Sequence, residues 1–310
     1  MRGYIIGLIV LLILSVGGYY GYQWYQEREA ATSEEEQEGA AMDEEQAMQE
    51  NETRIGTSAG GLDIPIAHYG NGDTELLFVG GIHGGYSWNT ALVAYELMDY
   101  LEENPEAVPA NVTVSVIPVL NPDGLQEVVG TTGRFTRADV PSGEGATIPG
   151  RFNANDVDLN RNFACDWQAD AVWQDRDVSG GTGEFSEPEA QVIRGYINRN
   201  NPEAVVVYYS SAGGVFASNC HEGVLAETRA LVNTYADASG YPAFEQFDFY
   251  EITGDMTNWL ASEGVPAISV LLTSHTDTEW SKNRAGIEAI LEYYADPSTD
   301  AQDEGEVEVQ

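Results

Sequence analysis

The chain has 310 residues, of which 43% are hydrophobic, and it carries 51 acidic against 13 basic side chains. The net charge of −38 makes nucleic acid and anionic membrane surfaces poor partners. The hydrophobic content is ample for a core, and we expect one large domain. Because Lys282 is the single lysine, the composition is typical of adaptation to high salt or cationic surroundings, although drift within a family gives the same pattern.

The N-terminal segment, residues 1–26, predicts a membrane anchor or a signal peptide. Arg2 precedes an apolar stretch at residues 4–18, and an aromatic belt typical of membrane interfaces follows at residues 19–25. The apolar stretch is short for a membrane span, and Ser15-Val-Gly17 fits a cleavage site. We expect an uncleaved anchor that places the domain outside the cytoplasm; cleavage would instead give a secreted protein.

Two acidic segments flank the region with a globular pattern. Residues 27–54 are rich in Glu, Gln and Ala and have no apolar stripe, so we predict a disordered tether. Residues 296–310 are acidic and lack any base, which predicts a disordered tail. The folded domain is therefore expected over residues 55–295.

Within residues 55–295, apolar runs alternate with stretches of helical periodicity. We expect a short β-meander at 55–65, strands at 75–80, 111–120, 204–209 and 266–273, and helices at 89–101, 186–199, 225–239, 255–262 and 284–294. Ser186 and Pro188 fit the N-cap and first position of the second helix. This alternation predicts an α/β fold: a mainly parallel, mixed twisted sheet with helices on both faces and a ligand site beyond the C-terminal strand ends.

Residues 121–170 lose all periodicity, and a loop of this length in a compact domain is usually functional. Its part at residues 149–166 carries Arg151 and Arg161 among several side-chain amides and has almost no apolar anchor. Guanidinium groups are suited to holding carboxylates. The alternative is an ordinary surface connection in which Asn and Asp cap local turns.

Cys165 and Cys220 are the two cysteines, and their spacing fits neither a zinc ribbon nor a thioredoxin motif. One disulfide is expected if the compartment is oxidising.

The loops after the four predicted core strands and the polar loop share a pattern with a known family. The most specific piece is Val-Asp-Leu-Asn-Arg-Asn-Phe at residues 157–163, preceded by Asn-Pro-Asp-Gly at residues 121–124. Together with the Gly-rich loop around His83, these motifs resemble the zinc carboxypeptidase family, the carboxypeptidase A-like metallopeptidases and their bacterial relatives that trim cell-wall peptides. The resemblance covers roughly residues 55–295.

In that family, a histidine, a glutamate and a second histidine bind zinc and leave one position open for water. A further glutamate is the general base. The resemblance implies that His83 is the first zinc ligand and that Asp158 orients its imidazole. It also implies a disulfide between Cys165 and Cys220 that joins the polar loop to the exit of the third strand.

The resemblance also implies how a substrate would be held. Asn160 and Arg161 would bind its terminal carboxylate, and Arg151 would polarise the scissile carbonyl, which makes Arg151 catalytic if the protein is active. Tyr250 would cover the pocket, although a core tyrosine in the aromatic run 247–250 is the alternative. Asp255 either borders a pocket for an amine-bearing side chain or caps the next helix.

The chain departs from the family at the residues that perform the reaction. Tyr86 and Ser87 stand where the zinc-binding glutamate should be, Tyr209 replaces the second histidine, and Leu271 and Leu272 occupy the place of the general base. Neither a phenol nor a hydroxyl is an anionic zinc ligand at neutral pH. We therefore expect zinc, the family's cofactor, to be absent or weakly bound.

Three hypotheses about function follow. The first is a membrane-tethered, extracytoplasmic, non-catalytic domain that binds peptides with a free C-terminal carboxylate, such as cell-wall peptides. The second is an active metallocarboxypeptidase whose zinc site is rearranged to His83, His221 and His275, although surface or loop-capping roles are the favoured interpretation of His221 and His275. The third is a structural scaffold that keeps these residues by inheritance.

Overall fold

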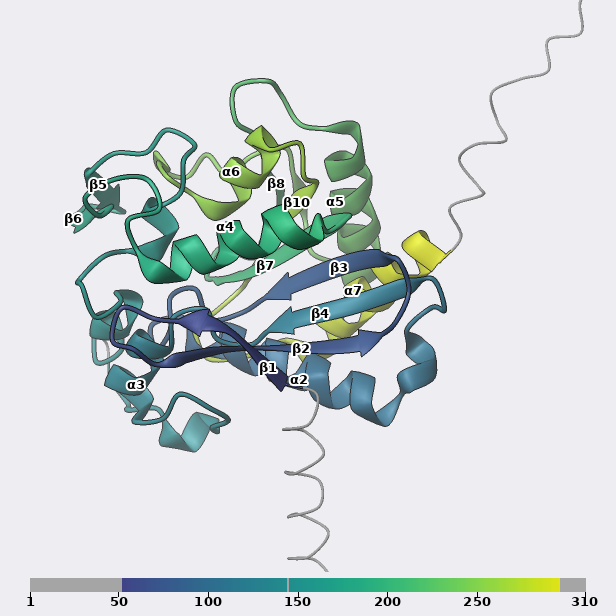
Figure 1. Cartoon of the computed structure of the whole chain (residues 1–310), viewed down its shortest axis with the longest axis horizontal. Coiled ribbons are helices and arrows are strands. Elements are labelled where there is room, and N and C mark those ends of the chain that lie inside the picture. Colours follow the sequence, from purple (N-terminus) through teal and green to yellow (C-terminus); the bar gives the residue numbers. More distant parts are fainter. Residues whose placement is uncertain (1–51, 144, 296–310) are drawn as a thin grey trace, which may run out of the picture. The chain divides into compact units, whose positions relative to one another are not determined.

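A mixed sheet forms the centre of the fold, and within the described residues it has eight strands in the order β1-β2-β4-β3-β7-β10-β8-β9 (Figure 1). The computed structural model describes residues 52–143 and 145–295. The predicted anchor, the acidic tail and nearly all of the tether lie outside the described residues. Residues 52–54, predicted as the end of the tether, instead belong to the first strand.

The elements have the following bounds. The strands of the main sheet are β1 (Glu52–Thr57), β2 (Asp63–Gly70), β3 (Thr74–Val79), β4 (Val112–Ile117), β7 (Ala204–Ser210), β8 (Gly214–Ala217), β9 (Ala243–Phe244) and β10 (Ala267–Leu272). A separate hairpin pairs β5 (Asp170–Trp173) with β6 (Arg176–Ser179). The α-helices are α2 (Trp88–Glu103), α3 (Pro122–Val129), α4 (Pro188–Asn200), α5 (Ala226–Ser239), α6 (Met256–Ser262) and α7 (Trp280–Ala295).

The four central strands, β4, β3, β7 and β10, run parallel to one another. The β1-β2 hairpin joins one side of this group antiparallel, and β8 pairs antiparallel with β10 on the other side. The predicted α/β fold with a mainly parallel mixed sheet is therefore confirmed, and the C-terminal ends of all four parallel strands lie along one edge.

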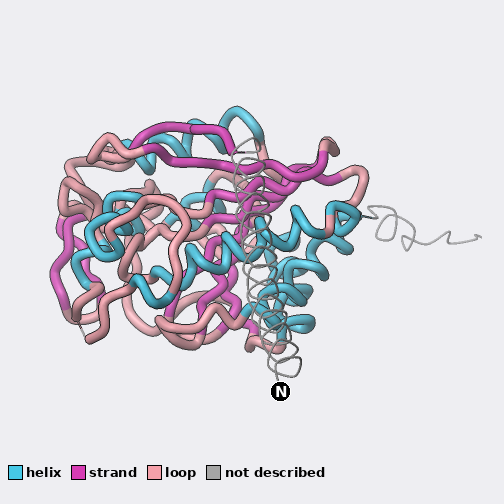
Figure 2. The backbone as a smooth tube through the Cα atoms, turned by 90° about the horizontal axis from the view of Figure 1, so that it is seen from below, coloured by secondary structure: helices cyan, strands magenta, loops and turns pink. Residues whose placement is uncertain are grey.

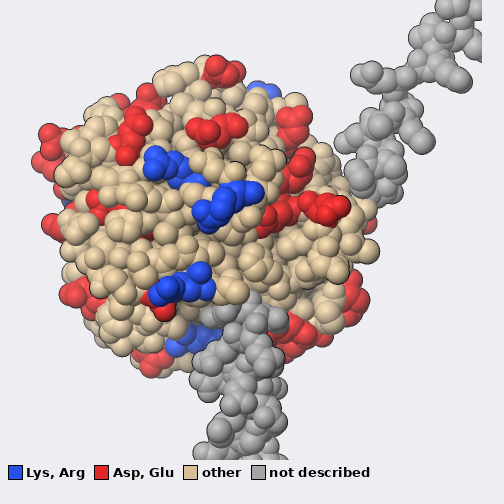
Figure 3. Space-filling model, viewed as in Figure 1, with Lys and Arg blue, Asp and Glu red and all other residues tan. Residues whose placement is uncertain are grey.

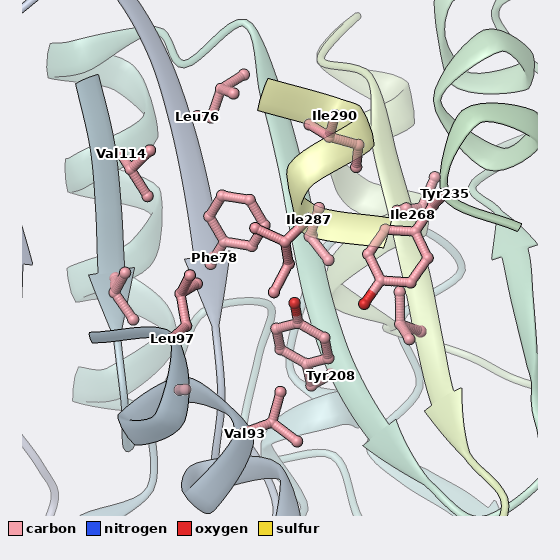
Figure 4. Close-up of a cluster of buried hydrophobic side chains, with 14 of the residues drawn as sticks. Leu76, Phe78, Val93, Leu97, Val114, Tyr208, Tyr235, Ile268, Ile287 and Ile290 are labelled. Carbon is pink, nitrogen blue, oxygen red and sulfur yellow. The ribbon is translucent and has the colours of Figure 1, made fainter. Parts of the chain in front are cut away.

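Both faces of the four parallel strands are buried, since nearly every residue of these strands is buried and consecutive residues point to opposite faces. Phe78 and Tyr208 pack with residues of α2, α5 and α7 in the cluster that Figure 4 shows. Their neighbours Val79 and Tyr209 belong to a second cluster with residues of α4 and α6. Figure 2 shows the strands between helices that lie on both sides, as predicted.

Several local predictions need correction. The expected meander is a hairpin whose second strand continues to Gly70. Helix α3 lies inside the stretch that was predicted to be irregular: the Asn121 side chain accepts a hydrogen bond from the Gly124 N–H at its start, and Gly130 ends it in the left-handed conformation. Strand β8 also lies in an expected loop. At α4 the N-cap is Glu187, without a side-chain cap, rather than Ser186.

On the face shown in Figure 3, acidic side chains are spread around the periphery, and a few basic side chains lie near the middle. Within residues 52–143 and 145–295, no helix combines the length and the apolar character needed to cross a membrane.

Candidate functional site

A cavity of about 380 Å³ lies where the parallel strands end, on the face of the sheet that α6 helps to cover. Most of the residues singled out in the sequence line it: His83, Tyr86, Arg151, Asn160, Tyr209, Tyr250, Asp255, Leu271 and His275. The cavity lies beyond the C-terminal ends of the strands, which is where a ligand site was expected.

His83, Asp158 and Arg151 form a buried network beside the cavity. The Arg151 Nε and Nη2 atoms each lie 2.8 Å from Asp158 Oδ2, and the Asn160 backbone N–H donates to Asp158 Oδ1. His83 Nε2 is 3.3 Å from the same Oδ1, but neither ring nitrogen has a well-formed hydrogen bond to a described residue. The structure thus brings His83 to Asp158 as expected, and it leaves a buried imidazole with hydrogen-bonding capacity to spare.

The electrostatics of this network keep the histidine neutral and the aspartate charged. Burial and the nearby Arg151 charge lower the pKa of His83 to about 4, against the opposing effect of Asp158. Burial alone would raise the pKa of Asp158, but Arg151 and His83 outweigh it and hold that pKa far below its usual range. At neutral pH the network therefore contains one ion pair and a neutral imidazole.

The expected joint role of Asn160 and Arg161 around one carboxylate needs correction. All three guanidinium nitrogens of Arg161 donate to backbone carbonyls, of Asn160 and Val172, and Arg161 does not line the cavity. The Asn160 amide lines the cavity, but it donates to Asp255 Oδ2 and accepts from the Tyr209 hydroxyl. Both side chains are buried and already bonded within the protein.

The sheet determines which residues occupy the positions of the missing catalytic groups. Tyr209 and Leu271, which pair across β7 and β10, line the cavity, whereas Leu272 points into the core on the opposite face. Tyr86 likewise lines the cavity, while Ser87 is buried at the start of α2. Of the residues expected at the places of the family's zinc-binding glutamate, second histidine and general base, Tyr86, Tyr209 and Leu271 are therefore the ones that line the cavity.

These residues do not fit a zinc ion. Burial raises the pKa of Tyr86, and burial together with Asp255 raises that of Tyr209 well above the usual value, so both phenols stay protonated at neutral pH. The Tyr209 hydroxyl is moreover bonded to Asn160. His83 alone keeps the donor chemistry of the family, and a zinc site needs at least three protein ligands.

The rearranged zinc site is not supported by the positions of the other histidines. His221 is on the surface, 2.8 Å from Asp166, and does not line the cavity. His275 lines the cavity, where its Nδ1 lies 2.8 Å from Ser210 Oγ and its ring lies beside that of Tyr86. The structure therefore separates His221 from the other two.

Cys165 and Cys220 form the expected disulfide, and Asp166 and His221 lie beside it. Among the described residues, one group of His, Cys, Asp or Glu side chains is close enough to hold a metal ion, and it consists of Cys165, Cys220 and His221. Because both of its sulfur atoms are in the disulfide, this group does not provide thiolate ligands.

Tyr250 and Asp255 both take positions at the cavity. Tyr250 is half-buried, packs edge-on against Phe247 and lines the cavity, so it is not a core residue. Asp255 lines the cavity and also caps α6, since its Oδ1 accepts from the Asn258 N–H. The two roles considered for Asp255 are therefore combined in one carboxylate.

Sequence reasoning did not identify Trp173 as a residue that lines the cavity and packs against Arg151. This residue ends β5, and its ring centroid lies 4.2 Å from the Arg151 guanidinium carbon. Trp173 lies in a stretch without hydrophobic periodicity, just past the end of the polar loop. An isolated tryptophan in such a stretch was the available signal, because a large ring is seldom left without a packing partner.

An α/β sheet of this topology, with such a cavity at its strand ends, is the architecture of the carboxypeptidases. A family model described as zinc carboxypeptidase matches residues 40–279. The chain therefore belongs to the zinc carboxypeptidase family.

Among curated proteins, the chain is similar to γ-D-glutamyl-L-diamino acid endopeptidase 1 of Lysinibacillus sphaericus, with 23% identity over 217 residues. That match covers 64% of this chain and 54% of the relative, so the chain spans about half of the relative's length.

Solved structures show the same fold. Murein-tripeptide amidase MpaA from Escherichia coli O157 matches with a TM-score of 0.54 and 19% identity, over 78% of this chain and 91% of its own. Bovine thrombin-activatable fibrinolysis inhibitor matches with a TM-score of 0.61 and 14% identity, over 83% and 94%. Carboxypeptidase A from Helicoverpa armigera matches with a TM-score of 0.57 and 18% identity, over 79% and 66%.

Proposed function

We propose that this domain binds peptides through their C-terminal residue and does not hydrolyse them. One observation supports the proposal: Tyr86, Tyr209 and Leu271, which we assign to the places where the family's reaction needs two zinc ligands and a base, line the cavity together with Arg151. A neutral phenol or an isobutyl group neither binds zinc usefully nor takes a proton from water. The cavity keeps a cation for a ligand but lacks the groups for the reaction.

Arg151 is the group that holds the ligand's carboxylate. Its Nε and Nη2 are bonded to Asp158, but its Nη1 has no hydrogen bond to any described residue, and the side chain lines the cavity. The buried imidazole of His83, which also lines the cavity, can supply a further donor. Charge-assisted hydrogen bonds of this kind are the strong ones in carboxylate recognition.

Asp255 selects the side chain of the bound residue. Its carboxylate lines the same cavity as Arg151, and Phe216 and Phe247 supply apolar wall between the polar groups. A residue with a free carboxylate and an amine at the end of its side chain matches this pairing of charges. The curated relative is named for a diamino acid and one solved neighbour for a murein tripeptide, and cell-wall peptides of that kind are the ligand class that we infer here.

The cellular setting belongs to the same proposal. The apolar N-terminal segment, residues 4–18, anchors the chain in a membrane and places the domain outside the cytoplasm, or leads to secretion if it is cleaved. The disulfide between Cys165 and Cys220 is in keeping with an oxidising compartment.

Binding of the tripeptide Ala-Ala-Lys, measured by titration calorimetry, tests the proposal. Amidation of its C-terminus is expected to weaken binding by about tenfold or more, because Arg151 then has no carboxylate to hold. Exchange of lysine for norleucine is expected to weaken binding to the wild type but not to Asp255→Asn. Asparagine at 255 can still cap α6 through its amide oxygen; it removes the charge and also the oxygen that accepts from Asn160.

Hydrolysis is measured in the same samples. After incubation with zinc, free lysine should stay at the background level of a protein-free control. Release of lysine that a chelator stops would overturn the non-catalytic assignment, and equal binding of the free and amidated peptides would overturn the role of Arg151.

A further inference from the structure

A second cavity, of about 670 Å³, adjoins the first. Tyr86, Trp173, Gln174 and His275 line both cavities. The two spaces are therefore compartments of one cleft that share a wall. A peptide whose last residue lies in the first compartment has the second one beside it for the residues that precede the terminus.

The charge of the second cavity is opposite to that of the chain as a whole. Arg137 and Arg176 line it, and no aspartate or glutamate among the described residues does. Neither arginine forms an ion pair within residues 52–143 and 145–295. In a protein with a net charge of −38, two guanidinium groups in one cavity, without an ion pair among the described residues, are a local concentration of positive charge.

Acidic residues lie close to Arg137 and Arg176 in the sequence, but within the described residues their carboxylates form no ion pair with these arginines. Asp139 Oδ2 accepts hydrogen bonds from the Thr136 N–H and hydroxyl in a capping box, so this carboxylate is bonded away from Arg137. Asp175 and Asp177 flank Arg176 in the chain but do not line the cavity. Among residues 52–143 and 145–295, no carboxylate lines the cavity to neutralise this charge.

Trp173 fixes the position of Arg176 relative to the first compartment. The Arg176 guanidinium carbon lies 5.3 Å from the Trp173 ring centroid, and the Arg151 carbon lies 4.2 Å from the same centroid. Arg151 lines the first compartment and Arg176 the second, while Trp173 lines both. The buried ring of Trp173 thus contacts two guanidinium groups, that of Arg151 in the first compartment and that of Arg176 in the second.

We propose that the second cavity binds the carboxylate side chain of an acidic residue that lies one to three positions before the C-terminus of the ligand. The inference rests on the proposed function, because the terminal residue in the first compartment sets the direction of the chain. The ligand class is then an anionic peptide that ends in an amine-bearing residue. Arg137 and Arg176 hold its acidic side chain.

The test compares Glu-Ala-Lys with Gln-Ala-Lys by titration calorimetry at low salt. The glutamate peptide is expected to bind about fivefold more tightly, and this preference should fall in 0.5 M NaCl because the two arginines are accessible to solvent. Arg137→Gln and Arg176→Gln should each reduce the preference, and the double variant should abolish it. Arg199→Gln, which replaces an exposed arginine of α4 that lines neither compartment, is the control and should keep the preference.

The outcomes separate this inference from the proposed function. If both peptides bind with equal affinity and amidation still weakens them, the second cavity does not read acidic side chains, although the first still holds a carboxylate. If the preference is equally strong in the double variant, another group reads the glutamate and the inference is wrong. Inorganic phosphate that competes with both peptides equally would show a general anion site and would also overturn it.

Discussion

Replacement of Arg151 by methionine tests whether the network beside the cavity is a buried ion pair. Two guanidinium nitrogens of Arg151 lie 2.8 Å from Asp158 Oδ2, with the arginine side chain 3% and the aspartate side chain 0% exposed. Each charge-assisted hydrogen bond contributes about 1.5–3 kcal/mol, and removal of one partner of a buried pair costs about 3–5 kcal/mol. We expect the free energy of unfolding at pH 7 to fall by about 3–5 kcal/mol. Urea denaturation measures it, with Arg199→Met as an exposed control that should change stability by less than about 0.5 kcal/mol.

The same contacts predict how the loss of unfolding free energy in Arg151→Met changes with pH. In the wild type the pKa of Asp158 is below its unfolded value, so its contribution is present above about pH 4 and is lost as the pH falls further. Without Arg151, burial dominates and raises the pKa of Asp158 above its unfolded value, so that stability is instead lost as the pH rises from about 4 toward 7. The deficit of Arg151→Met should therefore be largest at pH 7 and shrink toward pH 4. A deficit below 1 kcal/mol, or one that is constant across this range, would refute the reasoning.

Two further predictions concern a buried acid and the zinc site. Burial raises the pKa of Glu189 to about 7. The stability that this buried, protonated carboxyl contributes is therefore lost as the pH rises from the usual pKa of a glutamate to about 7. In urea titrations, Glu189→Gln should gain up to about 3 kcal/mol of unfolding free energy over the wild type between about pH 4.5 and pH 8, and a pH-independent difference would contradict this. The variant Tyr86→Glu, Tyr209→His completes three ligands with His83 and should retain about one zinc per chain after dialysis, measured by mass spectrometry, while the wild type retains far less. Adding His83→Ala should remove the bound metal, and retention no higher than in the wild type would show that these positions are not the family's ligand positions.

The central strands could be located from the sequence because both of their faces are buried. The run predicted at residues 75–80 is strand β3 at Thr74–Val79, since a continuous apolar stretch that ends in glycine has few other interpretations. Helix α3 could not be found in this way. It has eight residues, contains Gly124 and buries little more than its first turn, so it leaves no apolar stripe for a periodicity argument.

The site could be predicted in its location but not in its contacts. The choice between Leu271 and Leu272 depends on which face each residue takes in the sheet, and two adjacent leucines carry no signal about that. Arg161 bonds to the carbonyl of Val172, which belongs to a hairpin that the sequence did not suggest. Such long-range partners are set by tertiary packing, and local pattern holds no information about them.

The polar loop at residues 149–166 is buried because it satisfies its own hydrogen-bonding groups. Asn153 donates to Glu187 and Glu189, Asn160 to Asp255, and Arg161 to backbone carbonyls. Groups that suggested a ligand in the sequence thus make buried hydrogen bonds within the protein. Arg151 retains a nitrogen that faces no partner among the described residues. In the proposed function, a carboxylate ligand therefore depends mainly on one guanidinium group.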